Sequence, residues 1–517
     1  MHIGDVNIAR LLWNTAELMP SRIAMRQDAL SCTYAELAGR AAAVHESLLA
    51  ADVKHGDRVG ILLANGMDAA AAFYGTVAAG AIATVISGLA RPRQIEFLLR
   101  DSGAKVLITS RAMLDSQPRP LNEPVRILLT DELARIGERG PVETDDSLPA
   151  QISYTSGSTG TPKGVVITHA NLRVGTRTVV DYLKITVADR IASLLPFSFV
   201  YGFNQLNCAI ATGAMLEVID TTLAPEMVRS LAARECSVVA AVPPLWMQLL
   251  SVADFAVPIP SLRVLTCAGG RLNPEGVRAL RRAQQHAELV LMYGLTEVFR
   301  STYLSPDEVD AHPDSMGRAV RGSRVYVLRE DGSECADGEV GELVHAGPTV
   351  AAGYWGDSAG TARVFRPNRW AGADETALAT AVHSGDLVRR DAEGRFYYVG
   401  RRDRMIKTLG YRVSPDEITD VLFASGLLAD AAITTEPDPQ RGDRIIAHLV
   451  LRDGATLDAI RRWSGAELPR HMLPVRWELY PQLPRNASGK HDILRLASSE
   501  IRDPGSGRAH HPAESDS

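Results

Sequence analysis

The sequence predicts an α/β fold that continues into a β-rich region and ends in a small separate unit. Helix and strand patterns alternate through the first third of the chain, which is typical of layered α/β domains. Short apolar runs between Gly and Asp turns fill residues 323–400, and a new helix pattern follows Arg404. A chain of 517 residues is too long for one hydrophobic core, so two or more domains are expected.

The alternation begins with a capping box, Thr33 and Glu36, in front of a helical run over Tyr34–Ala51. Helices are also expected before Gly80 and over Pro92–Asp101. Three apolar runs between these helices read as strands: Arg58–Leu63, Thr84–Ile86 and Lys105–Thr109. Strands that are separated by helices usually pair in parallel, so the pattern predicts a largely parallel sheet.

The pattern changes in the second half of the chain. Ser414, Pro415 and Glu417 supply the N-cap, the first-turn proline and the capping-box acid of a new helix. The polar residues 501–517 are expected to form a disordered tail. Four short apolar runs read as strands: Val325–Leu328, Glu342–His345, Phe396–Val399 and Ile445–Leu451.

The composition is that of an ordinary globular protein, and it excludes some functions. The net charge of -6 argues against a nucleic-acid-binding protein. The five cysteines are scattered without metal-ligand spacing, which favours reduced thiols in a cytoplasm. The N-terminus lacks the pattern of a signal peptide, and Gly75 and Gly80 interrupt the most apolar run. We expect a cytoplasmic protein without stable membrane insertion; its oligomeric state cannot be predicted.

A polar loop, SYTSGSTGTPKG at Ser153–Gly164, stands between apolar residues that read as two strands. Its backbone N–H groups, hydroxyls and Lys163 are the groups that hold polyphosphate. A Walker A loop is excluded, because Pro162 precedes Lys163 and a strand follows in place of a helix. The order of residues favours a phosphate loop over a solvated hairpin.

The stretch YTSGSTGTPKGVVITH resembles the phosphate loop of the adenylate-forming superfamily, which includes acyl-CoA synthetases, peptide-synthetase adenylation domains and firefly luciferase. The resemblance covers nearly the whole chain. Four further motifs follow in the family's order and with consistent spacing: YGLTE at Tyr293–Glu297, SGDL at Ser384–Leu387, GRRDRMIKTLGYRVSPDEI at Gly400–Ile418 and PRNASGK at Pro484–Lys490.

The resemblance implies a large N-terminal domain over residues 1–402 and a small mobile α+β domain over residues 403–500. The large domain is expected to hold two layered α/β subdomains and a β-rich subdomain. The implied reaction is attack of a carboxylate on the α-phosphate of ATP, which gives an acyl-adenylate and pyrophosphate. Because two anions must meet, electrostatic stabilisation must supply most of the rate enhancement.

The resemblance also assigns the nucleotide-binding residues. Glu297 is the expected Mg²⁺ ligand, since hard cations take carboxylate oxygens. Thr296 is expected to bind the α-phosphate, and Tyr293, which Gly294 follows in the same motif, to stack on adenine. The loop expected to wrap the β- and γ-phosphates, with Thr155 also assigned to catalysis, comprises Thr155, Ser156, Gly157, Ser158, Thr159, Gly160, Thr161, Pro162 and Lys163.

Three further residues complete the expected adenylation site. Asp386 suits the ribose, since a carboxylate accepts two hydrogen bonds from a vicinal diol. Arg401 follows fifteen residues later, as the family pattern requires, and is expected to support the ribose and phosphate. Lys490 is the expected catalytic lysine, whose flexible ammonium bridges the attacking carboxylate and the α-phosphate. Each could instead be a charge on a surface turn, and only the motif spacing argues otherwise.

The basic segment Gly400–Arg412 is expected to link the two domains, with Asp403 at the hinge. After adenylation the small domain is expected to rotate, so that Lys490 leaves the site. Lys407, Gly410 and Tyr411 would then help to build a tunnel for the incoming thiol. A basic surface loop is the alternative interpretation.

The acid pocket is expected at Leu195–Gln205, LPFSFVYGFNQ, facing Gly269 and Gly270. Amino-acid-activating domains often read Phe-Asp where this chain reads Phe199-Val200. An ammonium group beside Val would be unpaired, so the sequence favours an acid without an α-amino group. Many CoA ligases carry His at the position of Phe199. Arg300 either meets a second polar group of the substrate or faces solvent.

The leading hypothesis is an AMP-forming ligase that uses ATP and Mg²⁺ to activate a small carboxylic acid and transfers it to coenzyme A. The alternative acceptor is the phosphopantetheine arm of an acyl carrier protein acting in trans. A luciferase-like oxidoreductase and a non-catalytic nucleotide-binding module are less favoured, since Glu297, Asp386, Arg401 and Lys490 are all present.

Overall fold

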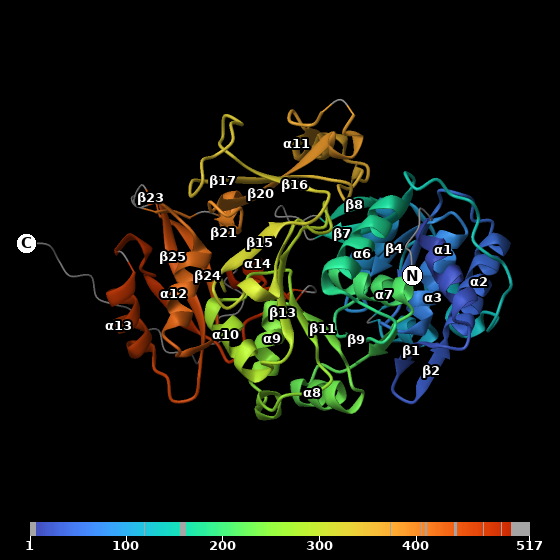
Figure 1. The fold of residues 1–517 in the computed structure, drawn as a ribbon, viewed down its shortest axis with the longest axis horizontal. Coiled ribbons are helices and arrows are strands. Elements are labelled where there is room, and N and C mark those ends of the chain that lie inside the picture. Colours follow the sequence, from blue (N-terminus) through green and yellow to red (C-terminus); the bar gives the residue numbers. More distant parts are fainter. Residues whose placement is uncertain are drawn as a thin grey trace, which may run out of the picture. The chain divides into compact units, whose positions relative to one another are not determined.

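The computed structural model describes residues 7–117, 119–155, 162–372, 374–404, 406–408, 411–438, 442–468, 470–486 and 489–497. The chain divides into two compact units, residues 1–398 (the N-terminal unit) and 399–517 (the C-terminal unit), drawn together in Figure 1. Within the described part, no helix is long and apolar enough to cross a membrane.

The first sheet of the N-terminal unit has seven strands in the order β18-β8-β7-β4-β3-β5-β6. Strands β3 to β6 are parallel, as the alternating pattern predicts, and the helices begin and end within a few residues of their predicted bounds. The strands are β3 (Arg58–Leu62), β4 (Ile82–Ile86), β5 (Ala104–Thr109), β6 (Arg126–Leu129), β7 (Pro149–Thr155), β8 (Lys163–Thr168) and β18 (Gly353–Tyr354). The helices of this region are α2 (Tyr34–Ala50), α3 (Met67–Ala78), α4 (Pro92–Ser102) and α5 (Arg111–Asp115).

The second sheet combines a parallel part with an antiparallel part. The parallel strands are β1 (Ile23–Gln27), β9 (Arg190–Ser193), β10 (Met215–Val218), β11 (Val238–Ala241), β12 (Val264–Cys267) and β13 (Glu288–Tyr293). The remaining strands are β2 (Leu30–Thr33), β14 (Thr302–Leu304), β15 (Ser315–Ala319), β16 (Arg324–Leu328), β17 (Val340–Ala346), β19 (Phe365–Pro367), β20 (Thr380–Arg390) and β21 (Phe396–Arg401). The antiparallel part confirms the predicted β-rich region.

One hydrophobic core joins the two sheets through the helices between them. Phe73 of α3 packs against Phe203 of α7 with ring centroids 4.3 Å apart, and the Tyr74 hydroxyl donates to Asn207 Oδ1 at 2.9 Å. A second core, which includes buried Trp246 and Phe255, lies under α8, α9 and α10 on the other side of the parallel strands (Figure 1). The remaining helices of this unit are α1 (Ile8–Leu18), α6 (His169–Leu183), α7 (Val200–Thr212), α8 (Ala224–Ala233), α9 (Pro243–Leu250), α10 (Pro274–Ala283) and α11 (Ser358–Val364).

The C-terminal unit is a five-stranded sheet with helices, which confirms the predicted α+β architecture. Ser414 caps α12 as predicted, since its Oγ accepts from the Glu417 N–H at 3.4 Å and Pro415 opens the helix. The strands are β22 (Ile406–Thr408), β23 (Tyr411–Val413), β24 (Leu428–Asp438), β25 (Gly442–Leu451) and β26 (Arg476–Leu479). The helices are α12 (Pro415–Ala424), α13 (Leu457–Glu467) and α14 (Ile493–Ala497).

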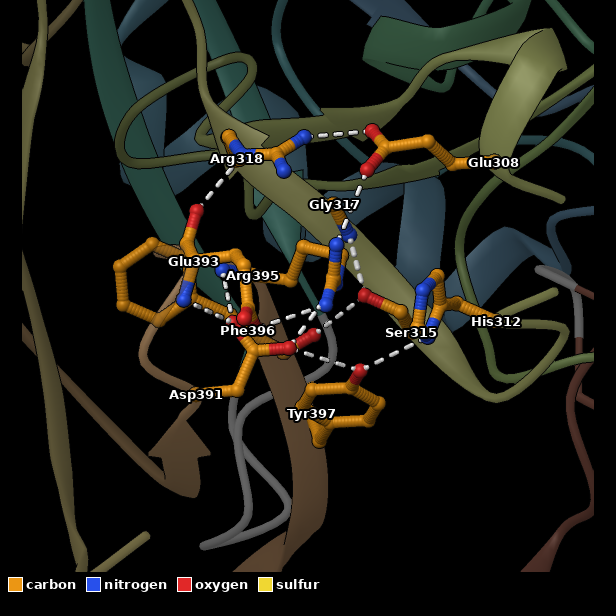
Figure 2. Close-up of polar contacts among 10 residues, drawn as sticks. All are labelled: Glu308, His312, Ser315, Gly317, Arg318, Asp391, Glu393, Arg395, Phe396 and Tyr397. Carbon is orange, nitrogen blue, oxygen red and sulfur yellow. Dashed lines mark hydrogen bonds and ion pairs between the residues drawn. The ribbon is translucent and has the colours of Figure 1, made fainter. Parts of the chain in front are cut away.

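A charged network ties β15 to the hairpin β20–β21, which carries the SGDL motif (Figure 2). Its centre is Arg395, whose guanidinium contacts Glu308 at 3.1 Å, Asp391 at 2.8 Å and Glu393 at 2.9 Å. The Tyr397 hydroxyl also donates to Asp391, at 3.0 Å. An arginine that is held by three acids fixes the hairpin more firmly than one exposed pair could.

Two half-buried acids of this network, Glu308 and Asp391, are held in their charged form. The hydrogen bond from Arg318, and then the bond from Arg395, lowers the pKa of Glu308. Burial alone would raise the pKa of Asp391, but hydrogen bonds from the Arg395 backbone N–H and the Tyr397 hydroxyl outweigh burial and lower it. A carboxyl whose pKa is lower in the folded state stabilises the fold above its unfolded pKa, about 4, and loses that effect as the pH falls below it.

We therefore expect Glu308→Gln to lower the free energy of unfolding by about 1–3 kcal/mol at pH 7, because it removes the charged acceptor of two arginines. The difference from the wild type should shrink as the pH falls below about 4, because the unfolded chain then binds a proton at this carboxyl that the folded state binds only at lower pH. Denaturant unfolding at pH 7 and pH 3.5 measures both values. Glu393→Gln is the matched control, since that side chain is 61% exposed and should change stability little. Equal losses at both pH values would contradict the assignment.

Candidate active site

Three predicted motifs lie at one edge of the second sheet. Strands β9, β12 and β13 are parallel, and they end at Ser193, Cys267 and Tyr293. The segment that leads to Phe199 follows the first, Gly269 follows the second, and the YGLTE motif starts at the end of the third. Ligands of α/β folds bind at the carboxyl edge of the parallel strands, so this edge is the candidate active site.

The SGDL motif forms a β-bulge between β17 and β20 that reaches this edge. The register shifts there, and Gly385 has a φ of 73°, a left-handed conformation that favours glycine. Ser384 Oγ donates to the Leu343 carbonyl at 2.6 Å and accepts from the Asp386 N–H at 3.0 Å. The bulge therefore fixes the direction of the Asp386 side chain.

Tyr293 and Asp386, the residues predicted at adenine and ribose, are in contact. The Tyr293 hydroxyl donates to Asp386 Oδ2, and Asp386 is 7% exposed. Burial, and then the negative charge of Asp386, raises the pKa of Tyr293 well above its usual value, so this hydroxyl stays a donor at neutral pH. Residues 93 positions apart in the sequence thus form one buried polar pair.

A second contact brings the phosphate loop to the YGLTE motif. The Tyr354 hydroxyl donates to Glu297 Oε1 at 2.7 Å, and the Lys163 ammonium lies 5.0 Å from the centroid of the Tyr354 ring. Tyr354 reaches this position because β18 pairs with β8, which Lys163 opens. Thr155 faces Lys163 across the hairpin, and Pro162 precedes β8. Ser156–Thr161, which include most of the predicted phosphate contacts, lie outside the described residues.

The segment after β13 folds back on itself in a strained turn. The Ser301 N–H donates to the Tyr293 carbonyl at 3.0 Å, and the Arg300 N–H donates to the Val298 carbonyl at 2.6 Å. Phe299, which lies between Val298 and Arg300, has a φ of 62°, and this conformation is unfavourable for a bulky side chain. A Cβ at Gly294 would lie 2.6 Å from the Phe299 carbonyl, so the turn requires glycine there. Such strain is common at functional sites.

The predicted acid-binding stretch opens helix α7. Phe199 is its N-cap, and Val200, its first residue, is half-buried. Gly269 has a φ of 79°, and a Cβ there would lie 3.2 Å from Val242 Cγ1. Gly270 is exposed, beside Pro243. Phe199, Val200, Gly269 and Gly270 are not among the residues that line the cavity described next.

A small cavity lies deeper, between α6, α7 and the parallel strands. Its polar lining residues are Tyr201, Asn204, Gln205, Thr266 and Arg300. Of the predicted stretch Leu195–Gln205, the residues that line this cavity are Tyr201, Asn204 and Gln205. The sequence left two positions open for Arg300, toward the substrate or toward solvent. Arg300 is only 4% exposed, so it does not face solvent. The structure thus brings the YGLTE segment and the acid-binding stretch together around one charged group.

Arg401 and Lys490 belong to the C-terminal unit. Lys490 is exposed on a turn in which the Asn486 N–H donates to the Lys490 carbonyl at 2.8 Å and the Lys490 N–H donates to Asn486 Oδ1 at 3.1 Å. Arg485 and His491, which flank the turn, both bind Asp430.

The predicted hinge and tunnel residues are described only in part. Asp403 lies in a short 3₁₀ helix, Arg402–Arg404, and Lys407 and Tyr411 lie in the paired strands β22 and β23. Gly410 lies outside the described residues.

The candidate site offers a magnesium ion one protein carboxylate, and substrate and waters would supply the other ligands. In the ranges described above, no cluster of three or more His, Cys, Asp or Glu side chains could hold a metal. Glu297 supplies one carboxylate, half-buried and oriented by Tyr354. This fits Mg²⁺, which is often bound by one or two carboxylates together with waters and substrate phosphates.

Sequence reasoning missed Tyr354 and left Arg300 undecided. Tyr354 stands in a two-residue strand without periodicity, so no pattern indicated its contact with Glu297. The position of Arg300, next to the YGLTE motif, was the only indication that it could reach the site.

Two family models match the chain in series. Residues 12–355 match the AMP-binding enzyme model, and residues 417–490 match the AMP-binding enzyme C-terminal domain. The chain belongs to the AMP-binding enzyme family. This confirms the resemblance that the sequence motifs indicated: the protein is an AMP-forming ligase that uses ATP to adenylate a carboxylic acid.

Full-length relatives of this AMP-binding enzyme use different acceptors. The L-proline–[L-prolyl-carrier protein] ligase of Pseudomonas fluorescens is 28% identical, over 91% of this chain and 94% of its own. The sulfoacetate–CoA ligase of Cupriavidus necator is 30% identical, over 90% and 92%. A solved structure of o-succinylbenzoate coenzyme A synthetase from Bacillus subtilis, in complex with ATP and magnesium ion, has a TM-score of 0.83 and 25% identity, over 95% and 99%.

We expect Tyr354→Phe to lower kcat/KM for adenylation about 10- to 100-fold. The substitution removes one hydrogen bond to a charged group and keeps the ring beside Lys163. The Mg²⁺ concentration for half-maximal rate should rise, because Glu297 loses its orientation. Pyrophosphate release over a Mg²⁺ titration measures both effects. Tyr303→Phe, which changes a hydroxyl that is not assigned to the site, is the control; an unchanged Mg²⁺ requirement in Tyr354→Phe would contradict the role.

Proposed function

We propose that this enzyme joins a small carboxylic acid without an α-amino group to the thiol of coenzyme A. In the first step a carboxylate oxygen attacks the α-phosphorus of ATP, and the bond to the β-phosphate oxygen breaks to release pyrophosphate. In the second step the thiol sulfur attacks the acyl carbon, AMP leaves, and the thiol proton passes to solvent. The phosphopantetheine arm of a carrier protein acting in trans is the second candidate acceptor.

The observation that carries the proposal is the pair of contacts at one sheet edge, Tyr293–Asp386 and Glu297–Tyr354–Lys163. The first pair supplies a flat ring and a buried carboxylate, which suit a nucleoside. The second supplies a carboxylate and an ammonium at the end of a polar loop, which suit a polyphosphate. Mg²⁺, when bound by Glu297, would neutralise part of the phosphate charge.

The chain's own residues supply the remaining electrostatics. Thr155, Thr296 and the loop Ser156–Thr161 donate hydrogen bonds to phosphate oxygens, and Arg401 supports the ribose and phosphate. Lys490 holds the attacking carboxylate against the α-phosphate and offsets their repulsion. Lys490 belongs to the C-terminal unit, so rotation of that unit between the half-reactions would withdraw it from the site. Asp403 is the proposed hinge, and Lys407, Gly410 and Tyr411 are proposed to line the thiol tunnel.

Coenzyme A is preferred as acceptor for two reasons. The relative with 30% identity and the solved synthetase described above are both named for coenzyme A. Val200 also argues against an amino acid, which the prolyl-carrier ligase activates. Pyrophosphate release across a panel of acids, amino acids and their deaminated analogues, with and without coenzyme A, tests both points. Preference for an α-amino acid would overturn the argument from Val200.

We expect Asp386→Ala to raise the KM for ATP at least 10-fold, because the ribose loses its charged acceptor. Tyr293 would also lose its hydroxyl partner. Isothermal titration with ATP measures the nucleotide affinity directly, without turnover. Glu393→Ala, in the turn that joins the strands of the same hairpin, is the control. ATP binding equal to that of the wild type in Asp386→Ala would show that the ribose site lies elsewhere.

We expect Lys490→Ala and Asp403→Pro to separate the two half-reactions. Lys490→Ala should lower adenylation by about two orders of magnitude or more, the scale for one electrostatic stabiliser. Given synthetic acyl-adenylate and coenzyme A, it should still form thioester at close to the normal rate. Asp403→Pro restricts the hinge backbone, so it should release pyrophosphate in a first turnover and form little thioester. Equal loss of both half-reactions in both variants would exclude domain rotation.

A further inference from the structure

A positive charge is buried in the cavity beside the active site. Arg300 is 4% exposed, and its Nε has no hydrogen-bond partner in the described structure. Its guanidinium lies 5.1 Å from the centroid of the Tyr201 ring. A cation–π contact offsets only part of the cost of removing a guanidinium from water.

The cavity offers this guanidinium no negative partner. The described residues that line it carry no carboxylate, and within the described ranges no ion pair joins Arg300 to an acid. Ile185 and apolar residues of α6, α7, β9, β11 and β13 form the rest of the wall. Buried charges are normally paired, so the cavity has the electrostatics of a site whose anion comes from outside the chain.

The neighbouring polar groups bring no negative charge to the guanidinium, although the Tyr182 hydroxyl lies within its hydrogen-bonding range. Tyr201 and Thr266 satisfy each other, with their hydroxyl oxygens 2.7 Å apart. The Tyr182 hydroxyl donates to Met292 Sδ at 2.8 Å; burial raises the pKa of Tyr182 to about 12 although the charge of Arg300 lowers it. Gln205 Oε1, another lining atom, is also buried without a hydrogen-bond partner in the described structure. A bound water or a donor group on a ligand would satisfy it.

The strained turn at Phe299 directs Arg300 into this cavity. Arg300 follows the residue with positive φ and lies three positions after Glu297, so the same turn serves the nucleotide side and the acid side. The Phe299 ring fills the space over Gly175 of α6, where a Cβ would lie 2.5 Å from the ring. Packing therefore holds the turn in its unfavourable conformation, as expected where strain has a function.

We propose that the acid activated by this enzyme carries a second anionic group, a carboxylate or sulfonate, which pairs with Arg300. This inference rests on the proposed function and names the substrate class of that site. A guanidinium holds either oxyanion through two parallel N–H donors. The cavity is about 20 Å³, on a scale where one water needs roughly 10–15 Å³, so it suits a compact terminal group and not a long apolar chain.

The test compares acids that differ only in the second anion. Succinate is paired with butyrate, glutarate with pentanoate, isophthalate with 3-methylbenzoate, and sulfoacetate with acetate. Pyrophosphate exchange gives kcat/KM for both members of each pair. In the wild type we expect at least one pair to favour the dianion 100-fold or more, and comparison of the carboxylate and sulfonate pairs identifies the anion.

Variants of Arg300 separate charge pairing from a structural role. In each pair for which the wild type prefers the dianion, Arg300→Met should reduce the ratio of the two kcat/KM values to about threefold or less, mainly because kcat/KM for the dianion falls. Arg300→Lys should keep a preference for the dianion of at least 10-fold. Arg300→Lys retains the charge and keeps the test valid if Arg300→Met fails to fold. The control is Arg282→Met, an exposed arginine on α10, which should leave the ratio unchanged.

Each other outcome overturns the inference. Arg300 does not bind a second anion if the wild type catalyses pyrophosphate exchange with the monoacids alone. The same conclusion follows if Arg300→Met lowers kcat/KM equally for both acids of a pair. Adenylation itself would then still stand. No exchange with these pairs or with the wider acid panel would overturn the proposed function as well.

Discussion

The turn between β13 and β14 is the constraint on which the rest of the site depends. The Ser301 N–H closes it onto the Tyr293 carbonyl, and the Ala351 N–H binds the Glu297 carbonyl at 2.8 Å. Within this short span the chain presents Tyr293 to Asp386, Glu297 to Tyr354 and a buried arginine to the opposite side. A left-handed phenylalanine is unfavourable by itself, and it persists because its ring is packed against α6. The packing of the Phe299 ring therefore stabilises a strained backbone conformation, and this conformation places three functional groups.

The site has to bring several anions together, and its charges are distributed accordingly. Glu297 and Asp386 are each bonded to a tyrosine hydroxyl, which orients a carboxylate without neutralising it. Lys163 stands beside the same tyrosine that orients Glu297. The catalytic lysine is proposed to come from the other unit, which lets the chain add and withdraw a positive charge between half-reactions.

The sequence was sufficient for what local patterns and motif order determine. Capping residues located α2 and α12, and alternation predicted the parallel strands of the first sheet. The motifs identified the family before any fold was known. Contacts between distant segments could not be predicted, because periodicity describes one element at a time. The pairing of β18 with β8, which brings Tyr354 to Glu297, joins positions that no local pattern connects.

Arg300 shows why burial decides what a charged residue can do. In the sequence it is one of many arginines, and exposure is the ordinary state of that side chain. At a surface its charge would be screened and would select nothing. In a cavity without a carboxylate, the same guanidinium disfavours an apolar ligand, which would leave it unpaired, and favours one that brings an oxyanion. The selectivity then comes from the cost of the wrong ligand as much as from the contact with the right one. Arg300, three positions after Glu297 of the YGLTE motif, is therefore the residue that we propose selects this enzyme's acid.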